Sequence, residues 1–190
     1  LALLATIAVV SNNAIAIADK NNEVVKQMFK DDQVATISKV DGLWVVGDSV
    51  ILGIRSELEA KAHIGLINAR VGRQAGELLE VIKHDKAKMA GMKTVLDLGN
   101  NNRLTSPEVE AIFLELKDQP LAIVVNTAVP RGWRDENNQL IASIASRYPN
   151  IRIVNWALKS ENHPEYFAPD GVHLIPAGIA AYVDAITNYL

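Results

Sequence analysis

From about residue 41 onward, short runs rich in Val, Ile and Leu alternate with longer segments of helical spacing. The strand-like runs are Leu43–Val46, Gly65–Ala69, Thr94–Leu98, Leu121–Asn126 and Ile151–Asn155. The helical segments are Val50–Ala62, Gln74–Met89, Ser106–Lys117, Asp135–Arg147 and Pro176–Tyr189. Strands that are apolar throughout are typical of a parallel sheet buried on both faces, and helices between them imply right-handed crossovers. The pattern predicts an α/β fold with a doubly wound, mainly five-stranded parallel sheet.

Three of the predicted helices carry start signals. Ser106 followed by Pro107 predicts an N-cap with proline in the first turn. Asp135 is a candidate cap for the next helix, and Pro176 opens the last one.

The bulk composition excludes several classes of protein. A chain of 190 residues can form one domain with a substantial core. The net charge of −3 provides no electrostatic surface for nucleic acid. The chain has no cysteine, which excludes disulfides and thiolate metal sites. No His, Asp or Glu cluster has metal-ligand spacing, and no cofactor is predicted.

The first residues are apolar in two blocks, residues 1–10 and 14–18, separated by Ser11-Asn12-Asn13. A spanning helix needs about 20 predominantly apolar residues, and this stretch is interrupted. We interpret residues 1–18 as the end of a membrane helix or an export segment, residues 19–40 as a linker, and residues 41–190 as the α/β domain. The alternative is a frayed apolar arm.

Polar loops follow the predicted strands. In an open α/β sheet, functional residues gather at the carboxyl ends of the strands. Four such loops are notable, and a fifth, residues 170–173, precedes the last helix and can reach the same edge. The four are Gly47–Ser49, Arg70–Gln74, Gly99–Asn102 and Asn126–Arg131.

Two of these loops supply a nucleophile and its base. Ser49 follows a buried strand and precedes a helix, whose N-terminus favours developing negative charge. Asp170 lies three residues before His173 in a turn-rich loop, so its carboxylate can fix the imidazole tautomer. The alternatives are a serine that only caps its helix and a surface Asp-Gly turn followed by an incidental histidine. Together the residues favour acyl transfer through a serine ester.

Acyl transfer also needs donors for the oxyanion. The candidates are the backbone N–H groups of Ser49 and Gly72 and the side-chain amide of Asn101. Gly72 can equally serve a tight turn, and the three successive asparagines 100–102 can equally form a polar loop. The chemistry alone does not choose among those asparagines.

The loops together resemble the SGNH (GDSL-type) hydrolase family, over residues 42–190. The family's serine, glycine, asparagine and histidine look like Ser49, Gly72, Asn101 and His173, with Asp170 in the family's Asp-x-x-His. The resemblance implies a flavodoxin-like, three-layer α/β/α sandwich.

A finer resemblance is to the extracytoplasmic domain of peptidoglycan O-acetyltransferases. It is carried by Gly47–Val50, Val71–Gln74, Asn126–Arg131 with Trp133, and Asp170–Leu174. It implies acetyl transfer to the muramic acid C6 hydroxyl of cell-wall glycan through an acetyl-serine. The acetyl donor would come from an upstream membrane acyltransferase domain, and the domain would act at the extracytoplasmic face of the membrane, attached through its N-terminus.

The resemblance also suggests residues that contact the glycan: Asp48, Arg73, Gln74, Arg131 and Trp133. One block departs from the family pattern, because Gly99-Asn100-Asn101-Asn102 stands where Gly-Thr-Asn-Gly is frequent. The register still puts Asn101 at the family asparagine, but the positioning of the acceptor around it can differ.

Two other functions remain open. One is a carbohydrate esterase, deacetylase or lipase-like esterase of the same fold, with water as acceptor. The other is a non-catalytic module that binds glycan or phosphate. A dinucleotide site is disfavoured, since no Gly-x-Gly-x-x-Gly follows the first strand. The α/β-hydrolase elbow Gly-x-Ser-x-Gly is also absent, because Ile51 occupies its last position.

Overall fold

The computed structural model describes residues 35–36 and 42–190. The range 1–18, interpreted as a membrane or export segment, lies outside the described residues. The same is true of the linker range 19–40 apart from residues 35–36. Within the described part of the chain, no helix has the length and apolar character needed to cross a bilayer.

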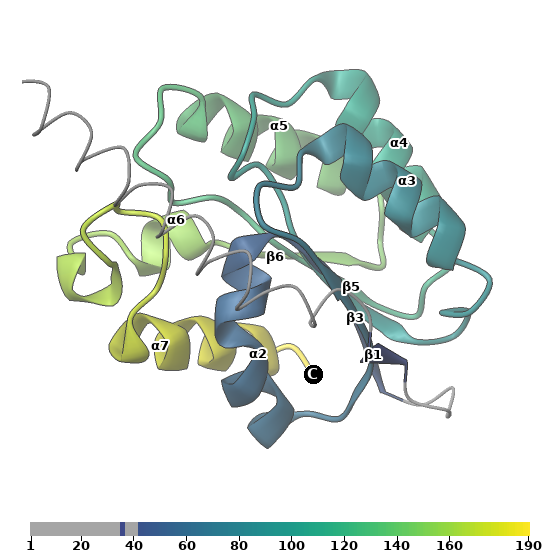
Figure 1. Ribbon diagram of the computed structural model, residues 1–190. Helices are drawn as coiled ribbons and strands as arrows, with labels where there is room; N and C mark the ends of the chain where they lie inside the picture. The colour runs from purple at the N-terminus through teal and green to yellow at the C-terminus, as the bar shows by residue number, and fades with distance from the viewer. Residues whose placement is uncertain (1–34, 37–41) are drawn as a thin grey trace, which may run out of the picture. The chain divides into compact units, whose positions relative to one another are not determined.

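A six-stranded sheet forms the centre of the domain, in the order β1-β3-β2-β4-β5-β6 (Figure 1). The predicted five-stranded parallel sheet is confirmed. Its strands are β2 (Leu43–Gly47), β3 (Ile64–Ala69), β4 (Lys93–Asp97), β5 (Ala122–Val125) and β6 (Ile151–Val154).

The sixth strand, β1 (Ala35–Thr36), pairs antiparallel with β3 at one edge of the sheet. It was not predicted and falls inside the range interpreted as a linker. Two residues are too few to show the alternation that predicts a strand.

Helices cover both faces of the sheet, which confirms the three-layer flavodoxin-like sandwich (Figure 1). One layer contains α2 (Ser49–Lys61) and α7 (Pro176–Thr187). The other contains α3 (Ala75–Asp85), α4 (Ser106–Leu116) and α5 (Arg134–Ala145). Two short elements that were not predicted, α6 (Trp156–Lys159) and the 3-10 helix η1 (Pro164–Tyr166), follow β6.

The central strands are apolar because they meet helices on both sides. Every residue of β2 and β5 is buried, and Trp44, Val45 and Val46 are fully so. Burial of such side chains stabilises the fold by about 25 cal/mol per Å² of apolar surface removed from water.

The predicted helix bounds differ from the observed ones by at most two residues, except at the end of the second helix. The second predicted helix was expected to reach Met89 but ends at Asp85. Beyond it the chain tightens into i to i−3 bonds, from Lys88 N to the Asp85 carbonyl (2.9 Å) and from Met89 N to the Lys86 carbonyl (3.2 Å). The N-cap of α4 is Thr105 rather than Ser106. Asp135 does not cap α5 but lies in its first turn, where a carboxylate favours the helix dipole.

Candidate active site

Ser49 is the first residue of α2 and directly follows the loop that ends β2. The cap of this helix is Asp48, whose Oδ1 accepts from Val50 N at 2.8 Å. The interpretation of Ser49 as the N-cap is therefore wrong. With the cap supplied by its neighbour, the Ser49 hydroxyl is left for other partners beside the free N–H groups of the first turn.

His173 provides one such partner. Its Nε2 lies 3.0 Å from Ser49 Oγ, and its Nδ1 lies 2.7 Å from Asp170 Oδ2. A carboxylate at Nδ1 keeps the proton on that nitrogen, which leaves Nε2 as an acceptor for the serine hydroxyl. The structure thus brings together the three side chains that the sequence analysis grouped from opposite ends of the domain.

The turn of residues 170–173, here called the base turn, holds the carboxylate in place. Asp170 Oδ1 accepts from the backbone N–H groups of Val172 (2.8 Å) and His173 (3.0 Å). Partial burial raises the pKa of Asp170, but the hydrogen bonds from the His173 side chain and from both backbone groups outweigh it and lower the pKa below its usual value. The carboxylate therefore stays ionised opposite the imidazole.

The predicted oxyanion donors lie in different situations. Ser49 N belongs to the first turn of α2. Gly72 is exposed in a tight turn with φ +70°, where glycine is favoured. Asn101 Nδ2 donates to Asp48 Oδ2 at 2.5 Å and to the Arg73 carbonyl at 3.2 Å. Both amide hydrogens of Asn101 are thus engaged, so an oxyanion would have to replace one of these two bonds.

Arg73 does not project toward solvent as a glycan-binding side chain would. Its Nη1 donates to the carbonyls of Gly47 (3.0 Å) and Asn68 (2.6 Å), and its Nη2 donates to Asn68 Oδ1 (2.9 Å). The residue is 9% exposed. The predicted substrate contact of Arg73 is therefore corrected: the guanidinium ties together the ends of β2 and β3.

The other predicted glycan contacts lie around the same edge. Gln74 is exposed as the N-cap of α3, and Arg131 is exposed in the loop after β5. Trp133 is half-buried before α5, and its indole Nε1 is buried without a hydrogen-bond partner among the described residues. The Asp48 carboxylate is bonded within the loops: its Oδ1 accepts from Val50 N, and its Oδ2 accepts from the side-chain amides of Asn100 and Asn101.

Asp97, at the end of β4, was missed by the sequence analysis. It is 3% exposed, and its Oδ1 accepts from Asp48 N at 3.1 Å. Burial raises its pKa well above the usual value, and the neighbouring Asp48 carboxylate raises it further. The one available signal was an acidic residue at the end of an otherwise apolar strand, because such a residue is rarely buried without a partner.

Within residues 35–36 and 42–190, no group of three or more His, Cys, Asp or Glu side chains is placed to hold a metal ion. The chemistry available at this edge is that of a serine, an imidazole, a carboxylate and nearby N–H donors.

No family model matches the chain. It is 37% identical, over 146 residues or 76% of its length, to the peptidoglycan O-acetyltransferase OatA of Listeria monocytogenes. The chain spans only 23% of that relative's length, so the homology concerns one part of a larger protein.

Two solved structures share the architecture. The C-terminal catalytic domain of the Streptococcus pneumoniae peptidoglycan O-acetyltransferase A, with a methylsulfonyl adduct, superposes with a TM-score of 0.66 at 25% identity. That match covers 78% of this chain and 91% of the other. A lipase/acylhydrolase from Enterococcus faecalis gives a TM-score of 0.61 over 77% of this chain and 94% of the other. At 13% identity, it shows the fold alone.

Proposed function

We propose that this chain transfers acetyl groups to cell-wall peptidoglycan. The proposal starts from the family of the chain, which belongs to the SGNH hydrolases and is homologous to the peptidoglycan O-acetyltransferases. The acceptor is the muramic acid C6 hydroxyl, and the intermediate is an acetyl ester of Ser49. The observation that carries the proposal is the chain of contacts from Ser49 Oγ through His173 to Asp170, at 3.0 and 2.7 Å.

In the first half-reaction, Ser49 Oγ attacks the acetyl carbonyl while His173 Nε2 takes the hydroxyl proton. The carbonyl oxygen becomes an oxyanion, for which the N–H groups of Ser49, Gly72 and Asn101 are the proposed donors. The tetrahedral intermediate collapses, the bond to the donor oxygen breaks, and His173 returns its proton to that oxygen. Asp170 stabilises the imidazolium throughout.

The second half-reaction repeats these steps with a new nucleophile. The sugar hydroxyl loses its proton to His173 Nε2 and attacks the acetyl-serine carbonyl. Collapse releases the acetylated sugar, and the proton passes from His173 back to Ser49 Oγ. No cofactor is required. General-base assistance of this kind contributes about 10²–10⁴-fold to the rate.

The setting proposed for this reaction is the extracytoplasmic face of the cell membrane. In the full-length protein, an upstream membrane acyltransferase domain would supply the acetyl group, and the N-terminus would keep the domain membrane-attached. Exposed Gln74 and Arg131 and half-buried Trp133 are the proposed glycan contacts, whereas Asp48 is buried and bonded within the loops. Support for this arrangement comes from the homology and from the apolar composition of residues 1–18.

The test is transfer from an activated acetyl ester to a peptidoglycan oligomer, followed by mass spectrometry of the glycan and of the protein. We expect acetylated glycan and a transient acetyl adduct on Ser49. Ser49→Ala should lower turnover by about 10⁴- to 10⁶-fold, because a triad acts as a unit. Ser56→Ala, at an exposed position of the same helix, is the matched control and should leave turnover unchanged.

Hydrolysis is the second candidate, since the side chains of His173 and Asp170 are half exposed and water can reach an acetyl-serine. Free acetate as the only product, even at high glycan concentration, would favour an esterase. Glycan binding with no turnover of the ester would instead indicate a non-catalytic glycan-binding module, and unchanged turnover in Ser49→Ala would contradict the acetyl-serine intermediate.

A further inference from the structure

A groove of about 460 Å³ lies beside the candidate active site, between the start of α5 and the α6 segment. We call it the α5–α6 groove. Its volume is within the range of about 300–1,000 Å³ that is usual for ligand sites. The residues that matter here are Ala128, Arg134, Asp135, Asn155, Leu158 and Phe167.

Two walls of the groove are connected to the base turn. Phe167 forms an isolated antiparallel bridge with Leu174, and the next residue, Ala168, donates from N to the His173 carbonyl at 2.7 Å. On the other side, Ala128 lies two residues before Pro130, which packs so closely on Gly171 that a β-carbon there would be 3.0 Å from Pro130 Cγ. The groove is therefore bordered by the same two segments that contact the base turn.

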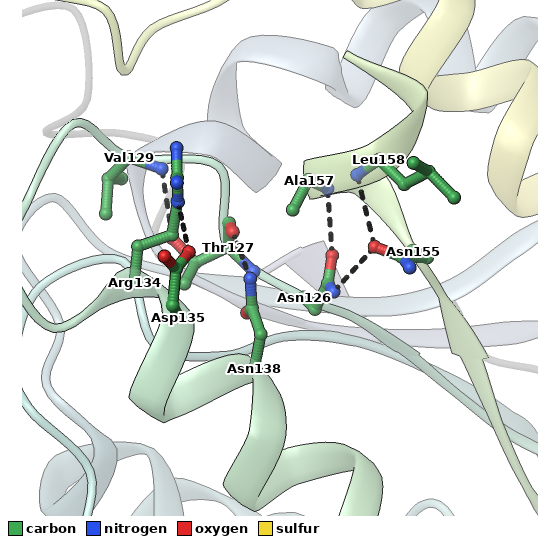
Figure 2. A network of polar contacts seen from close by, with 9 residues as sticks. All are labelled: Asn126, Thr127, Val129, Arg134, Asp135, Asn138, Asn155, Ala157 and Leu158. Atoms are coloured by element: carbon green, nitrogen blue, oxygen red, sulfur yellow. Dashed lines mark hydrogen bonds and ion pairs between the residues drawn. The ribbon is translucent and has the colours of Figure 1, made fainter. Parts of the chain in front are cut away.

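The floor of the groove is fixed by an amide network (Figure 2). Asn126 Nδ2 donates to Asn155 Oδ1 at 3.0 Å, and Asn126 Oδ1 accepts from Ala157 N at 3.0 Å. Asn155 Oδ1 also accepts from Leu158 N at 3.2 Å. These bonds join the ends of β5 and β6 to α6, so the groove is preformed and binding does not have to order it.

The lining combines hydrogen-bonding groups with small apolar faces. Six of its ten residues are polar or charged. Arg134 Nε donates to Asp135 Oδ1 at 2.7 Å at the exposed rim, and the Asn155 amide nitrogen points away from the network in Figure 2. Leu158 is 64% exposed. The one arginine and two carboxylates of the lining disfavour a polyanion, and the polar content disfavours an acyl chain.

A sugar ring has the matching chemistry, because its hydroxyls pair with amide, guanidinium and carboxylate groups while its C–H face packs on Leu and Phe. We propose that the α5–α6 groove is a binding subsite for an uncharged pyranose next to the acetylated sugar of the acceptor glycan. This proposal rests on the proposed function. It makes the groove a determinant of acceptor length, since a single sugar at the serine would leave it empty.

The test compares acceptors of different length with the double variant Asp135→Ala/Leu158→Ala, which changes two exposed side chains outside the triad. The matched control is Leu114→Ala/Arg147→Ala. It removes an exposed leucine of α4 and an exposed ion-pair partner in the turn after α5. Acetyl transfer from a small activated ester to the monosaccharide N-acetylmuramic acid and to a peptidoglycan tetramer that contains this sugar is measured, together with hydrolysis of the ester alone.

We expect the groove variant to raise the KM for the tetramer about tenfold, which corresponds to the loss of one or two net hydrogen bonds or an apolar contact. The KM for the monosaccharide and the hydrolysis of the ester should change less than twofold. An unchanged KM for the tetramer would overturn the proposal, as would an equal loss on all three measurements.

A second measurement separates this proposal from the proposed function. If the unaltered chain releases only acetate, transfer is absent, and tetramer binding is then measured by calorimetry on Ser49→Ala. Binding that weakens in the groove variant and persists in the control supports the subsite in a chain that is not a transferase. Binding that is absent or unaffected contradicts it.

Discussion

At the scale of single residues, the candidate site depends on which nitrogen of His173 carries the proton. Asp170 fixes this because its Oδ2 meets Nδ1 at 2.7 Å while Oδ1 is held by two backbone N–H groups. The position of the acid and its ionisation are thus determined by the base turn itself.

Replacement of that acid tests the tautomer directly. In Asp170→Asn, an amide N–H faces Nδ1, so the ring is protonated at Nε2 and cannot accept the serine proton. We expect kcat for a small acetyl ester to fall by about 10⁴-fold with little change in KM. Steady-state kinetics measures this, with Asp118→Asn at an exposed position as the control. A loss below tenfold would contradict the role assigned to the carboxylate.

At the scale of elements, the junction between β2 and α2 is packed to its limit. A β-carbon on Gly47 would lie 1.9 Å from Asp97 Oδ1 and 2.5 Å from Ile51 Cγ1. The strand, the helix and the buried acid of β4 therefore meet at a point that only glycine fits.

Gly47→Ala should lower the free energy of unfolding by about 3 kcal/mol or more, because overpacking is added to disruption of a buried polar pair. Gly53→Ala in α2 is the matched control. That position has open space around it, and alanine there should raise stability by about 0.5–1 kcal/mol. Urea denaturation of both variants gives the comparison, and equal stability of the two would show that the junction can relax.

Prediction from sequence succeeded where periodicity is strong and failed where short-range alternatives compete. The five parallel strands were found to within one residue at each end, because each is a continuous apolar run between polar loops. The cap of α4 was misplaced by one residue. Thr105 and Ser106 are both good caps, and the capping box between Thr105 and Glu108 decides the choice.

The three residues of the candidate triad could be predicted, because local sequence patterns mark them. Ser49, Asp170 and His173 each belong to a short motif, and the fold brings strand ends together. The inward turn of Arg73 could not be read from the chain, since its partners are backbone carbonyls at the ends of two strands. The α5–α6 groove also had no motif, because α6 and η1 are too short to show a period.

At the scale of the whole molecule, the buried Asp97 couples stability to pH. Burial and the nearby Asp48 raise the pKa of Asp97 in the folded state, whereas the pKa of an aspartate in an unfolded chain is about 3.9. Below that pH, Asp97 is protonated in both the folded and the unfolded state, so its ionisation does not change the free energy of unfolding. As pH rises above it, the unfolded chain releases the proton first, so the folded state loses relative stability until Asp97 itself ionises.

Asp97→Asn should remove this dependence of the free energy of unfolding on pH. For one proton, the slope is about 1.4 kcal/mol per pH unit. We expect the free energy of unfolding to vary less between pH 4 and 8 in the variant than in the unaltered chain. Urea titrations at several pH values measure it, with exposed Asp118→Asn as the control. Parallel curves for Asp97→Asn and the unaltered chain would exclude the raised pKa.

The separation of hydroxyl and imidazole along the polypeptide affects when activity can arise. Ser49 opens α2 and His173 precedes α7, and Lys61 Nζ links the two helices through Asp184 Oδ1 at 2.7 Å. During synthesis the early part of a chain emerges first. A nascent chain that ends before His173 therefore lacks the base that takes the serine proton, and a proteolytic cut that releases the base turn together with α7 would remove that base from the finished chain.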